Sequence, residues 1–547
     1  MAHIVATTDY LGDAAFAAVK ATGQVITWGS AACGGNSLSV RAQLESGVVH
    51  VAGSHRAFAA LKSQGSVVAW GDIGNGGSIA VVKNKVASGV KCLYATASAF
   101  AALKEDGSVV TWGDKYFGGK SRTVEEALKG GVLEIVASSG AFAALKSDGS
   151  VVAWGSTEFG GSILGVEEHL TSGVSQIISG YSAFAALKCD GKVVSWGGFS
   201  TPKDESISSV VEIASTTRAF AAVKSKGDLV TWGHRDWGGS THAIKEQLEE
   251  GVERVFATDS AFAALKANGS VVTWGNMQNG GNSRVVAEQL SSDVKDVCAS
   301  GWAFAALKSQ GSVVTWGSWK AGGDSIARSQ QLSHDVQGIF ANRLAFVALK
   351  GDGSVVTWGD ASSGGDCTQV QEQLTCDVVH IFSSNQAFAA VKSDGSVVTW
   401  GAAQSGGDST DVSSQLFFEL DTLSGLRKLG GGASIFADGK KEDMPSGRQN
   451  VESMADGDGE AVEIVNHSLK ASAERPCDDP ATGNEEYVNG SLAKSPISAA
   501  EHVSDTPLVE SPGKIVAKKE IQIEFQTKIK ELTMRMQSVT TDAGRRQ

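Results

Sequence analysis

The sequence predicts an all-β fold built from ten repeated units of about 42 residues, each with one short helix, followed by a disordered tail. A phenylalanine recurs ten times at steps of 42 residues, except for one step of 36, and a tryptophan follows each phenylalanine after twelve residues. A period this constant indicates one supersecondary unit stacked many times. The recurring residues are Phe16, Phe58, Phe100, Phe142, Phe184, Phe220, Phe262, Phe304, Phe346 and Phe388, with Trp28, Trp70, Trp112, Trp154, Trp196, Trp232, Trp274, Trp316, Trp358 and Trp400.

Each unit contains a β-hairpin signal. Two apolar runs, such as AFAALK at 141–146 and SVVAWG at 150–155, are joined by a turn that is Asp-Gly in five units and Asn-Gly in another. Glycine supplies the positive φ that a two-residue hairpin loop needs, so a two-residue loop is predicted. The glycines of these six turns are Gly107, Gly149, Gly191, Gly269, Gly353 and Gly395.

A short helix and a third strand follow the hairpin. After Trp-Gly come four variable residues, a Gly-Gly pair such as Gly238-Gly239, and a stretch such as STHAIKEQL at 240–248. Ser240 is a suitable N-cap and the apolar residues after it have helical spacing, so one or two turns of helix are predicted. The alternating apolar residues of VERVFAT at 252–258 predict the third strand.

We interpret the recurring phenylalanines and tryptophans as a core between units rather than as a stacking ladder for ligands. Residues that are identical in every unit are what packing between units requires. Burying one tryptophan removes roughly 200 Å² of surface from water, which is worth at most about 5 kcal/mol. Ten such side chains can hold an array of short strands together.

The ends of the array decide whether it closes. The N-terminal segment HIVAT (3–7) is similar to the third strand of a unit, and GGGASIFADG (430–439) is similar to the start of an eleventh. These fragments fit either one unit completed from both termini or the two caps of an open array. The contraction near 197–212 is a candidate seam between five units and five. One ring, two part-rings and an open spiral all fit the sequence.

Composition divides the chain at about residue 429. The array spans 1–429, and 430–513 is predicted to be a disordered acidic linker, because six of the seven prolines lie there together with Ser, Asp, Glu and Gly. The array carries about −7 of the formal net charge of −13. An acidic body argues against a nucleic-acid partner, which would normally select a basic stripe.

Composition also bounds the compartment and the chemistry. Seven cysteines without CxxC spacing favour reduced thiols and an intracellular protein, expected in the cytoplasm with the nucleus as the alternative. The N-terminus lacks the features of a signal peptide, and no stretch approaches 18 continuous apolar residues, so no membrane association is expected. Only His50 and His380 share a position in the repeat, and no catalytic or nucleotide-binding motif occurs. No catalytic residue, cofactor or metal site is predicted.

The order of these elements resembles a known repeat. An apolar strand ending in Ala-Thr or Ala-Ser, a hairpin of the AFAALKSDGSVVTWG type and a loop with paired glycines are similar to the regulator of chromosome condensation repeat, and to the propeller-type β-lactamase inhibitory proteins, over about residues 4–416. The resemblance implies a β-propeller whose loops on one flat face bind a protein partner. Two features depart from the family pattern. Family blades usually carry a histidine before the second strand, where this chain has alanine, as at Ala57 and Ala141, and family rings have seven blades.

The positions that vary after Trp-Gly are the candidate binding positions. Some units carry aromatic, basic or long apolar residues there, whereas others have only small ones, such as SAAC at 30–33. Exposed Trp, Tyr and Arg on a shared face are typical of interface anchors, although each ring could instead fold back over its own unit. A further tryptophan, Trp302, is interpreted as filling a gap beside the seam. The candidate partner-binding residues are Tyr116, Phe117, Phe159, His234, Arg235, Asp236, Trp237, Met277, Trp319 and Lys320.

Residues 514–540 are predicted to form an amphipathic or coiled-coil helix. Phe525, Ile529, Leu532 and Met536 follow heptad spacing, with Lys and Glu around them. Three heptads make a marginal isolated helix, so this helix is expected to form on a partner or by self-association.

Together these features predict a non-catalytic scaffold, not an enzyme, that binds a protein partner through the loops after each Trp-Gly. The resemblance implies a second function, guanine-nucleotide exchange on a small GTPase. The short loops argue against it, because propeller exchange factors act through an inserted wedge. A third function is that of a substrate-binding adaptor in a ubiquitin-ligase assembly.

Overall fold

Ten antiparallel sheets of three strands follow one another along the chain, and in each sheet the strands pair in chain order. The computed structural model describes residues 3–7, 12–198 and 207–418. All of them belong to the first of the two units into which the chain divides, Met1–Arg475 and Pro476–Gln547. The predicted all-β class with ten repeats is confirmed.

The strands of the ten sheets, in chain order, are β1 (His3–Ala6), β2 (Ala15–Val19) and β3 (Val25–Gly29); β4 (Val48–Gly53), β5 (Ala57–Lys62) and β6 (Val67–Gly71); β7 (Val90–Ala95), β8 (Ala99–Lys104) and β9 (Val109–Gly113); β10 (Val132–Ala137), β11 (Ala141–Lys146) and β12 (Val151–Gly155); β13 (Val174–Ser179), β14 (Ala183–Lys188) and β15 (Val193–Gly197); β16 (Val210–Ser215), β17 (Ala219–Lys224) and β18 (Leu229–Gly233); β19 (Val252–Ala257), β20 (Ala261–Lys266) and β21 (Val271–Gly275); β22 (Val294–Ala299), β23 (Ala303–Lys308) and β24 (Val313–Gly317); β25 (Val336–Ala341), β26 (Ala345–Lys350) and β27 (Val355–Gly359); β28 (Val378–Ser383), β29 (Ala387–Lys392) and β30 (Val397–Gly401).

Short helices follow most of the sheets, and nearly all are of the 3-10 type. The helix predicted at 240–248 is η8, but the predicted cap is wrong: Thr241 occupies the N-cap position, and no side chain caps the helix. The short helices are η1 (Ala31–Cys33), η2 (Leu38–Gln43), η3 (Lys115–Gly119), η4 (Arg122–Val124), η5 (Thr157–Phe159), η6 (Glu167–Leu170), η7 (Arg235–Trp237), η8 (His242–Leu248), η9 (Met277–Asn279), η10 (Arg284–Val286), η11 (Trp319–Ala321), η12 (Ile326–Arg328), η13 (Ala361–Ser363), η14 (Thr368–Leu374), η15 (Ala403–Ser405) and η16 (Thr410–Gln415).

The hairpins are confirmed, but their loops hold three residues rather than two. In the third sheet the Lys104 N–H donates to Ser108 O, and the Gly107 N–H donates back to Lys104 O, so residues 105–107 form the loop. Gly107 has a φ of 75°. A type I turn followed by one left-handed residue is the usual three-residue hairpin, so glycine is needed at its third position.

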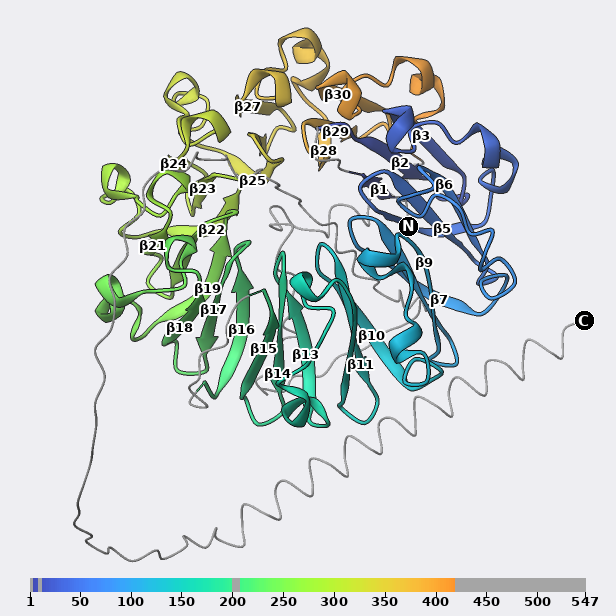
Figure 1. The fold of residues 1–547 in the computed structure, drawn as a ribbon. Helices are drawn as coiled ribbons and strands as arrows, with labels where there is room; N and C mark the ends of the chain where they lie inside the picture. Colours follow the sequence, from blue (N-terminus) through green and yellow to red (C-terminus); the bar gives the residue numbers. More distant parts are fainter. Residues whose placement is uncertain (1–2, 8–11, 199–206, 419–547) are drawn as a thin grey trace, which may run out of the picture. The chain divides into compact units, whose positions relative to one another are not determined.

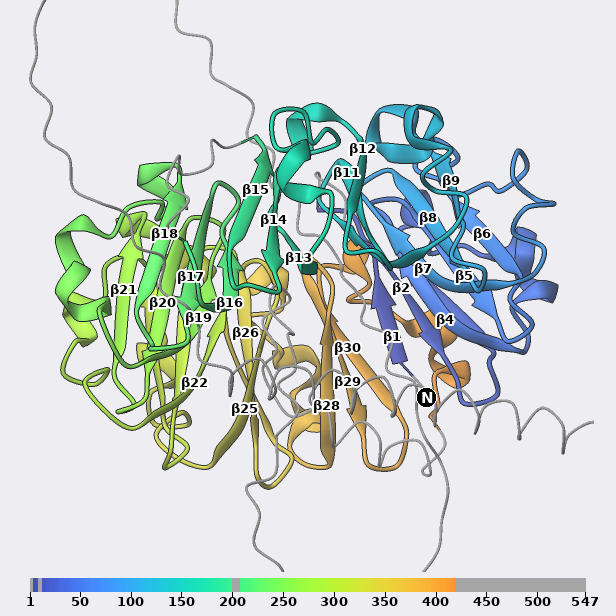
Figure 2. The same cartoon turned by 90° about the horizontal axis from the view of Figure 1, so that it is seen from below.

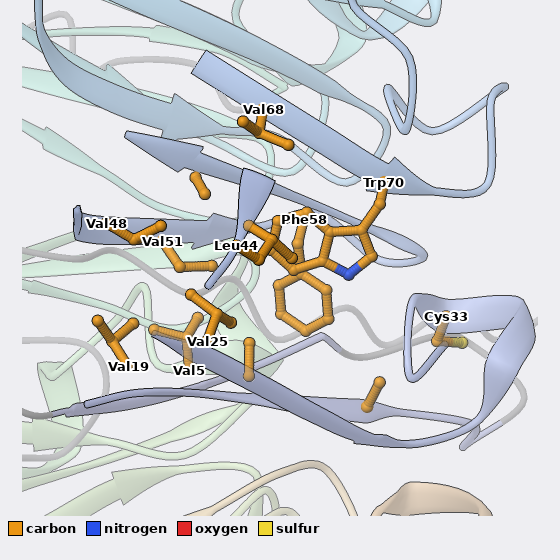
Figure 3. Packing of buried hydrophobic residues seen from close by; sticks show 13 residues of the cluster. Val5, Val19, Val25, Cys33, Leu44, Val48, Val51, Phe58, Val68 and Trp70 are labelled. Carbon is orange, nitrogen blue, oxygen red and sulfur yellow. The ribbon is translucent and has the colours of Figure 1, made fainter. Parts of the chain in front are cut away.

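The recurring Phe and Trp residues form the core between neighbouring sheets, as predicted. Each of the ten phenylalanines is at most 1% exposed and each tryptophan at most 4%. Within a sheet the two rings stack, with centroids 5.0–5.4 Å apart. Figure 3 shows one such joint, where Phe58 and Trp70 of the second sheet face Val5, Val19 and Val25 of the first.

A hydrogen bond from the indole to the preceding unit fastens the joints. The Trp70 Nε1–H donates to Gly34 O at 2.9 Å, and Gly34 is the first glycine of the preceding Gly-Gly pair. Nine of the ten indoles make this bond. The first strand of each sheet lies toward the centre of the ring and the third toward its periphery (Figure 1).

The first sheet packs against the tenth, and this joint closes one ring. The Trp28 Nε1–H donates to Gly406 O at 3.0 Å, the same bond that fastens the interior joints. The Ala14 N–H donates to Gln404 O at 3.0 Å. Both views place β28–β30 beside β1–β3 (Figures 1 and 2). The buried residues at this joint are Ile4, Phe16, Ala18, Ile26, Trp28, Ala387, Ala389, Val391, Leu416 and Phe418.

The closure resolves the alternatives left by the sequence. Most of the segment HIVAT does form a strand, β1, which pairs with β2 as the innermost strand of the first sheet. All three strands of that sheet therefore come from the N-terminal end, and the first and tenth sheets meet by packing face to face without sharing a strand.

The contraction near 197–212 does not break the ring. The fifth and sixth sheets share a buried cluster, and the Ser215 hydroxyl donates to Ser179 O at 3.2 Å across the joint. The loop that supplies the glycine carbonyl elsewhere is replaced here by GGFSTPKDESIS (197–208). In the described part of the chain, the buried Trp232 Nε1–H therefore has no acceptor.

The prediction that Trp302 fills a gap beside the seam is wrong. Trp302 lies between β22 and β23 of the eighth sheet, two sheets beyond the seam. It packs at the joint between the eighth and ninth sheets, with the Arg343 guanidinium 5.5 Å from its ring.

Several predictions fall on other parts of the chain. The acidic linker (430–513), the fragment at 430–439 and the helix at 514–540 lie outside the described residues. Within the described ranges, no helix has the length and apolarity needed to span a membrane. In the same ranges, no three His, Cys, Asp or Glu side chains are grouped so that they could hold a metal ion.

Candidate functional site

The residues between a Trp-Gly and the following Gly-Gly pair, here named the Trp-Gly turn, form a single helical turn in most units. The turn of the seventh unit is fixed at both ends. In the seventh unit the Asn276 side chain accepts hydrogen bonds from the Gln278 N–H (3.0 Å) and the Asn279 N–H (3.2 Å). Gly280 ends the turn with a φ of 105°, and its carbonyl accepts the indole bond of the next unit. Met277 is therefore held at the tip of a fixed turn.

The glycine that ends each turn packs directly on the core of the next unit. A Cβ at Gly280 would lie 2.5 Å from Cδ2 of Phe304, and a Cβ at Gly322 would lie 2.5 Å from Cδ2 of Phe346. Only glycine fits this close approach at a positive φ. The turns are thus mounted on the most buried part of the ring, which gives their tips a rigid support.

Three of the sequence-predicted residues are exposed turn tips. Tyr116 is 65% exposed, Met277 66% and Trp319 72%. The structure adds Ile73, which is 76% exposed in the second unit and was missed by the sequence prediction. Ile73 occupies the same turn position as Met277 and Trp319, three residues after the recurring Trp, so its place in the repeat was the available signal.

Three other predicted aromatics lie half-buried against the ring. Phe117 and Phe159, in turns of consecutive units, have ring centroids 6.1 Å apart, and the Phe159 ring meets Tyr181 edge-on at 5.7 Å. Trp237 packs on the joint between the sixth and seventh sheets, and the Arg218 guanidinium lies 5.0 Å from its ring. These three rings pack between the turns and the ring, so they support the turns and present little free surface.

The predicted polar residues are exposed. His234, Arg235 and Asp236 precede Trp237 on the turn of the sixth unit, where His234 takes the N-cap position of η7. The Lys320 ammonium lies 5.7 Å from the Trp319 ring, within the range of a cation–π contact.

The exposed apolar tips gather in two separate parts of the ring. Ile73 and Tyr116 belong to the second and third units, and Met277 and Trp319 to the seventh and eighth. In the seventh unit, Val285 on the following short helix is also exposed, at 98%. The turns of the ninth and tenth units carry only Ala, Ser, Asp and Gln. The face made by the turns is therefore not uniform around the ring.

Several groups whose pKa is shifted by burial lie away from the turns, on the innermost strands. His380 on β28 is half-buried beside Phe340 and Phe382, and its desolvation there lowers its pKa to about 4. His3 and His50 stack with centroids 5.9 Å apart. His3, His50 and His380 thus share one position on three consecutive inner strands, where the ring closes, so the prediction that only His50 and His380 share a position is wrong.

Comparison with known proteins finds weak similarities to solved structures. The sequence matches no protein-family model and no curated protein. Among solved structures, it is similar to Prp20p from Saccharomyces cerevisiae, a structure described together with its binding properties to Gsp1p and histones. The TM-score is 0.31 and the identity 16%, over 58% of this chain and 81% of that one.

Two further structures show the same weak similarity. Yeast RCC1 (Prp20) bound to Kap60 matches with a TM-score of 0.31 and 14% identity, over 65% of this chain and 78% of that one. The CRINKLY WD40 ectodomain of the Arabidopsis thaliana receptor kinase ACR4 matches with a TM-score of 0.28 and 14% identity, over 48% of this chain and 90% of that one. Ten three-stranded sheets joined in a closed ring define this chain as a repeat β-propeller on its own geometry.

Proposed function

We propose that the chain is a non-catalytic scaffold that binds a protein partner through the exposed tips of its Trp-Gly turns. One observation carries the proposal: Ile73, Tyr116, Met277 and Trp319 stand 65–76% exposed on turns that the repeat holds rigidly. Large apolar and aromatic side chains on a preorganised support are typical of interface hot spots, because little conformational entropy is lost when they are buried by a partner.

The test compares two sets of surface substitutions in the full chain. One variant carries Tyr116→Ser, Met277→Ser and Trp319→Ser. The control carries Leu133→Ser and Val211→Ser, which are exposed apolar residues on inner strands away from the turns. Proteins captured from the source cells are quantified for each variant. We expect the turn variant to lose its partner and the control to keep it, and equal recovery by both would contradict the proposal.

The turns support guanine-nucleotide exchange less well than they support a scaffold, because exchange is expected to need an inserted wedge. In the described segments, most turns after Trp-Gly are single helical turns, and none of the described turns contains a longer insertion. Prp20p, with its binding properties to Gsp1p, belongs to the solved structures similar in fold, but that similarity does not transfer a partner. A nucleotide-release assay against a panel of small GTPases separates the two functions, since faster release would favour exchange. An adaptor of a ubiquitin-ligase assembly would use the same turn tips. The turn variant should therefore also lose a ubiquitin-ligase substrate in the capture test.

A further inference from the structure

The joint that closes the ring carries a groove on the rim. The groove has a volume of about 530 Å³, which is in the range of ligand-binding clefts. Residues of η2 from the first unit line one side and residues of η16 from the tenth line the other, and every residue of β3 from Val25 to Gly29 contributes to it. The groove therefore follows the outermost strand of the first sheet.

The outer edge of β3 faces this groove. The Lys20 N–H donates to Gln24 O at 2.8 Å, across the pair next to the hairpin loop. In an antiparallel ladder every second residue bonds to the partner strand, so Ile26 bonds to β2 while Val25 and Thr27 direct their backbone groups away from it. Both Val25 and Thr27 line the groove.

One of these outward groups already has a partner, which shows that the edge accepts strand-like bonds. The Val25 N–H donates to Leu44 O at 2.9 Å. Thr27 is the next outward position along the strand. Within the described residues only its side chain is engaged, with Gly35 O and the Ser37 hydroxyl. Propeller blades commonly have four strands, whereas each sheet here has three. An extended peptide that adds to a sheet edge would supply the fourth.

The charges around the groove favour a basic peptide. Its ionisable residues are Arg41, Glu45, Asp408 and Asp411, which are all exposed. The groove thus carries three carboxylates and one guanidinium. The hydroxyl and N–H of Thr410 donate to the Asp408 carboxylate and hold its pKa below the ordinary value, which keeps it charged at neutral pH.

We propose that this rim groove binds an extended basic peptide, which adds to β3 as a fourth strand. Main-chain bonds to Thr27 give the register, and lysine or arginine side chains of the peptide meet Asp408, Asp411 and Glu45. The site lies beside the sheet edge. Ala31 and Ala403 of two Trp-Gly turns line it, but the exposed apolar tips of the proposed scaffold surface do not, so the two proposals are independent.

The probe is a fluorescein-labelled hexapeptide of alternating lysine and valine, titrated against the full chain by fluorescence anisotropy. We expect saturable binding that weakens with salt. Asp408→Asn with Asp411→Asn should weaken it about tenfold, because each exposed ion pair contributes up to about 1 kcal/mol. The same peptide with N-methyl groups on one backbone edge should lose binding, since it cannot pair with a strand. The turn variant described above should bind the peptide as the wild type does.

Thr27→Pro tests the edge from the protein side, since it removes the outward N–H without touching the bonds between β2 and β3. Thr111→Pro at the equivalent position of β9 is the matched control, and it should leave binding intact. If Thr27→Pro fails to fold, the N-methylated peptide still tests strand addition, because it leaves the protein unchanged. Equal binding of the N-methylated peptide would overturn strand addition. Equal binding of a glutamate–valine hexapeptide, or no saturable binding of the lysine–valine probe, would overturn the basic-peptide site.

Discussion

Tryptophans take different roles in this chain, and the position of each one in the repeat determines its role. Trp154 is 2% exposed, stacks on Phe142 and donates to Gly118 O at 3.1 Å. Trp319 is 72% exposed at a turn tip. The same side chain therefore serves the core in one place and a surface in the other.

Trp154→Ala and Trp319→Ala should differ strongly in stability. We expect Trp154→Ala to lower the free energy of unfolding by about 3–5 kcal/mol, because it leaves a cavity in a joint. Trp319→Ala should change it by less than about 0.5 kcal/mol. Urea denaturation followed by circular dichroism measures both, and similar losses for the two variants would contradict the assignment of the recurring tryptophans to the core.

The missing indole bond at the seam gives a second residue-scale prediction. Trp274→Phe removes a hydrogen bond to Gly238 O and should destabilise the ring by about 1 kcal/mol beyond the packing change. Trp232→Phe removes a buried N–H that has no acceptor among the described residues, so it should be less destabilising. A Trp232→Phe variant that unfolds at a lower urea concentration than Trp274→Phe would show that this indole does have a partner.

His380 should make the ring less stable in mild acid. Burial lowers its pKa from 6.5 to about 4, so below pH 6.5 the unfolded chain binds the proton more readily than the folded one. Keeping His380 neutral therefore contributes fully to the free energy of unfolding above about pH 6.5. This contribution is lost as the pH falls through about 4, and about 2 kcal/mol of it is gone by pH 5.

His380→Phe tests this, because it keeps the contacts with Phe340 and Phe382 but cannot take up a proton. Unfolding free energies at pH 7 and pH 5 should differ by about 2 kcal/mol less in this variant than in the wild type. The exposed His169→Phe serves as the control. An unchanged difference between the two pH values in His380→Phe would rule out His380 as the source.

At the scale of single elements, the Gly-Gly pair is the most constrained part of the unit. Gly238 has a φ of 94°, and a Cβ there would lie 2.5 Å from Cδ2 of Phe262. Gly165 has a φ of 93°, but a Cβ there would meet nothing within 4 Å. The two positions therefore share the backbone strain and differ only in the clash.

Gly165→Ala should lower the free energy of unfolding by about 1–2 kcal/mol, through strain alone. Gly238→Ala should lower it by a further 1–3 kcal/mol or so, because the methyl group overpacks the aromatic pair. Thermal or urea unfolding of both variants measures the difference. Equal losses would mean that the turn does not sit on the Phe262 ring.

The elements that repeat could be predicted from the sequence, and those that do not repeat could not. Ten concordant hairpins identified the strands, yet the loop length was wrong, because Asp-Gly fits both a two-residue turn and the third position of a longer one. The cap at Ser240 was wrong because Thr241 precedes a 3-10 turn that needs no side-chain cap. Ile73 was missed because exposure depends on which turn residue points outward, which the backbone decides.

At the scale of the whole molecule, the open question in the sequence was closure, and it depends on contacts between residues almost 400 positions apart. The bond from Trp28 to Gly406 repeats the bond that fastens the interior joints. No local pattern distinguishes a ring from a spiral. Both contain the same nine joints between consecutive sheets, and only the ring has a tenth joint, between the first and the tenth sheet.

The closed ring is tested most directly by a distance across the tenth joint. Spin labels at Thr22 and Ser413 span the joint between the first and tenth units, and labels at Gln64 and Arg41 occupy the equivalent positions at the joint between the second and first. The native cysteines that could also react, Cys189, Cys376 and Cys477, are replaced by serine. Double electron–electron resonance should give the same distance distribution for both pairs. A much longer distance for Thr22 and Ser413 than for the interior pair would show an open array and contradict the ring.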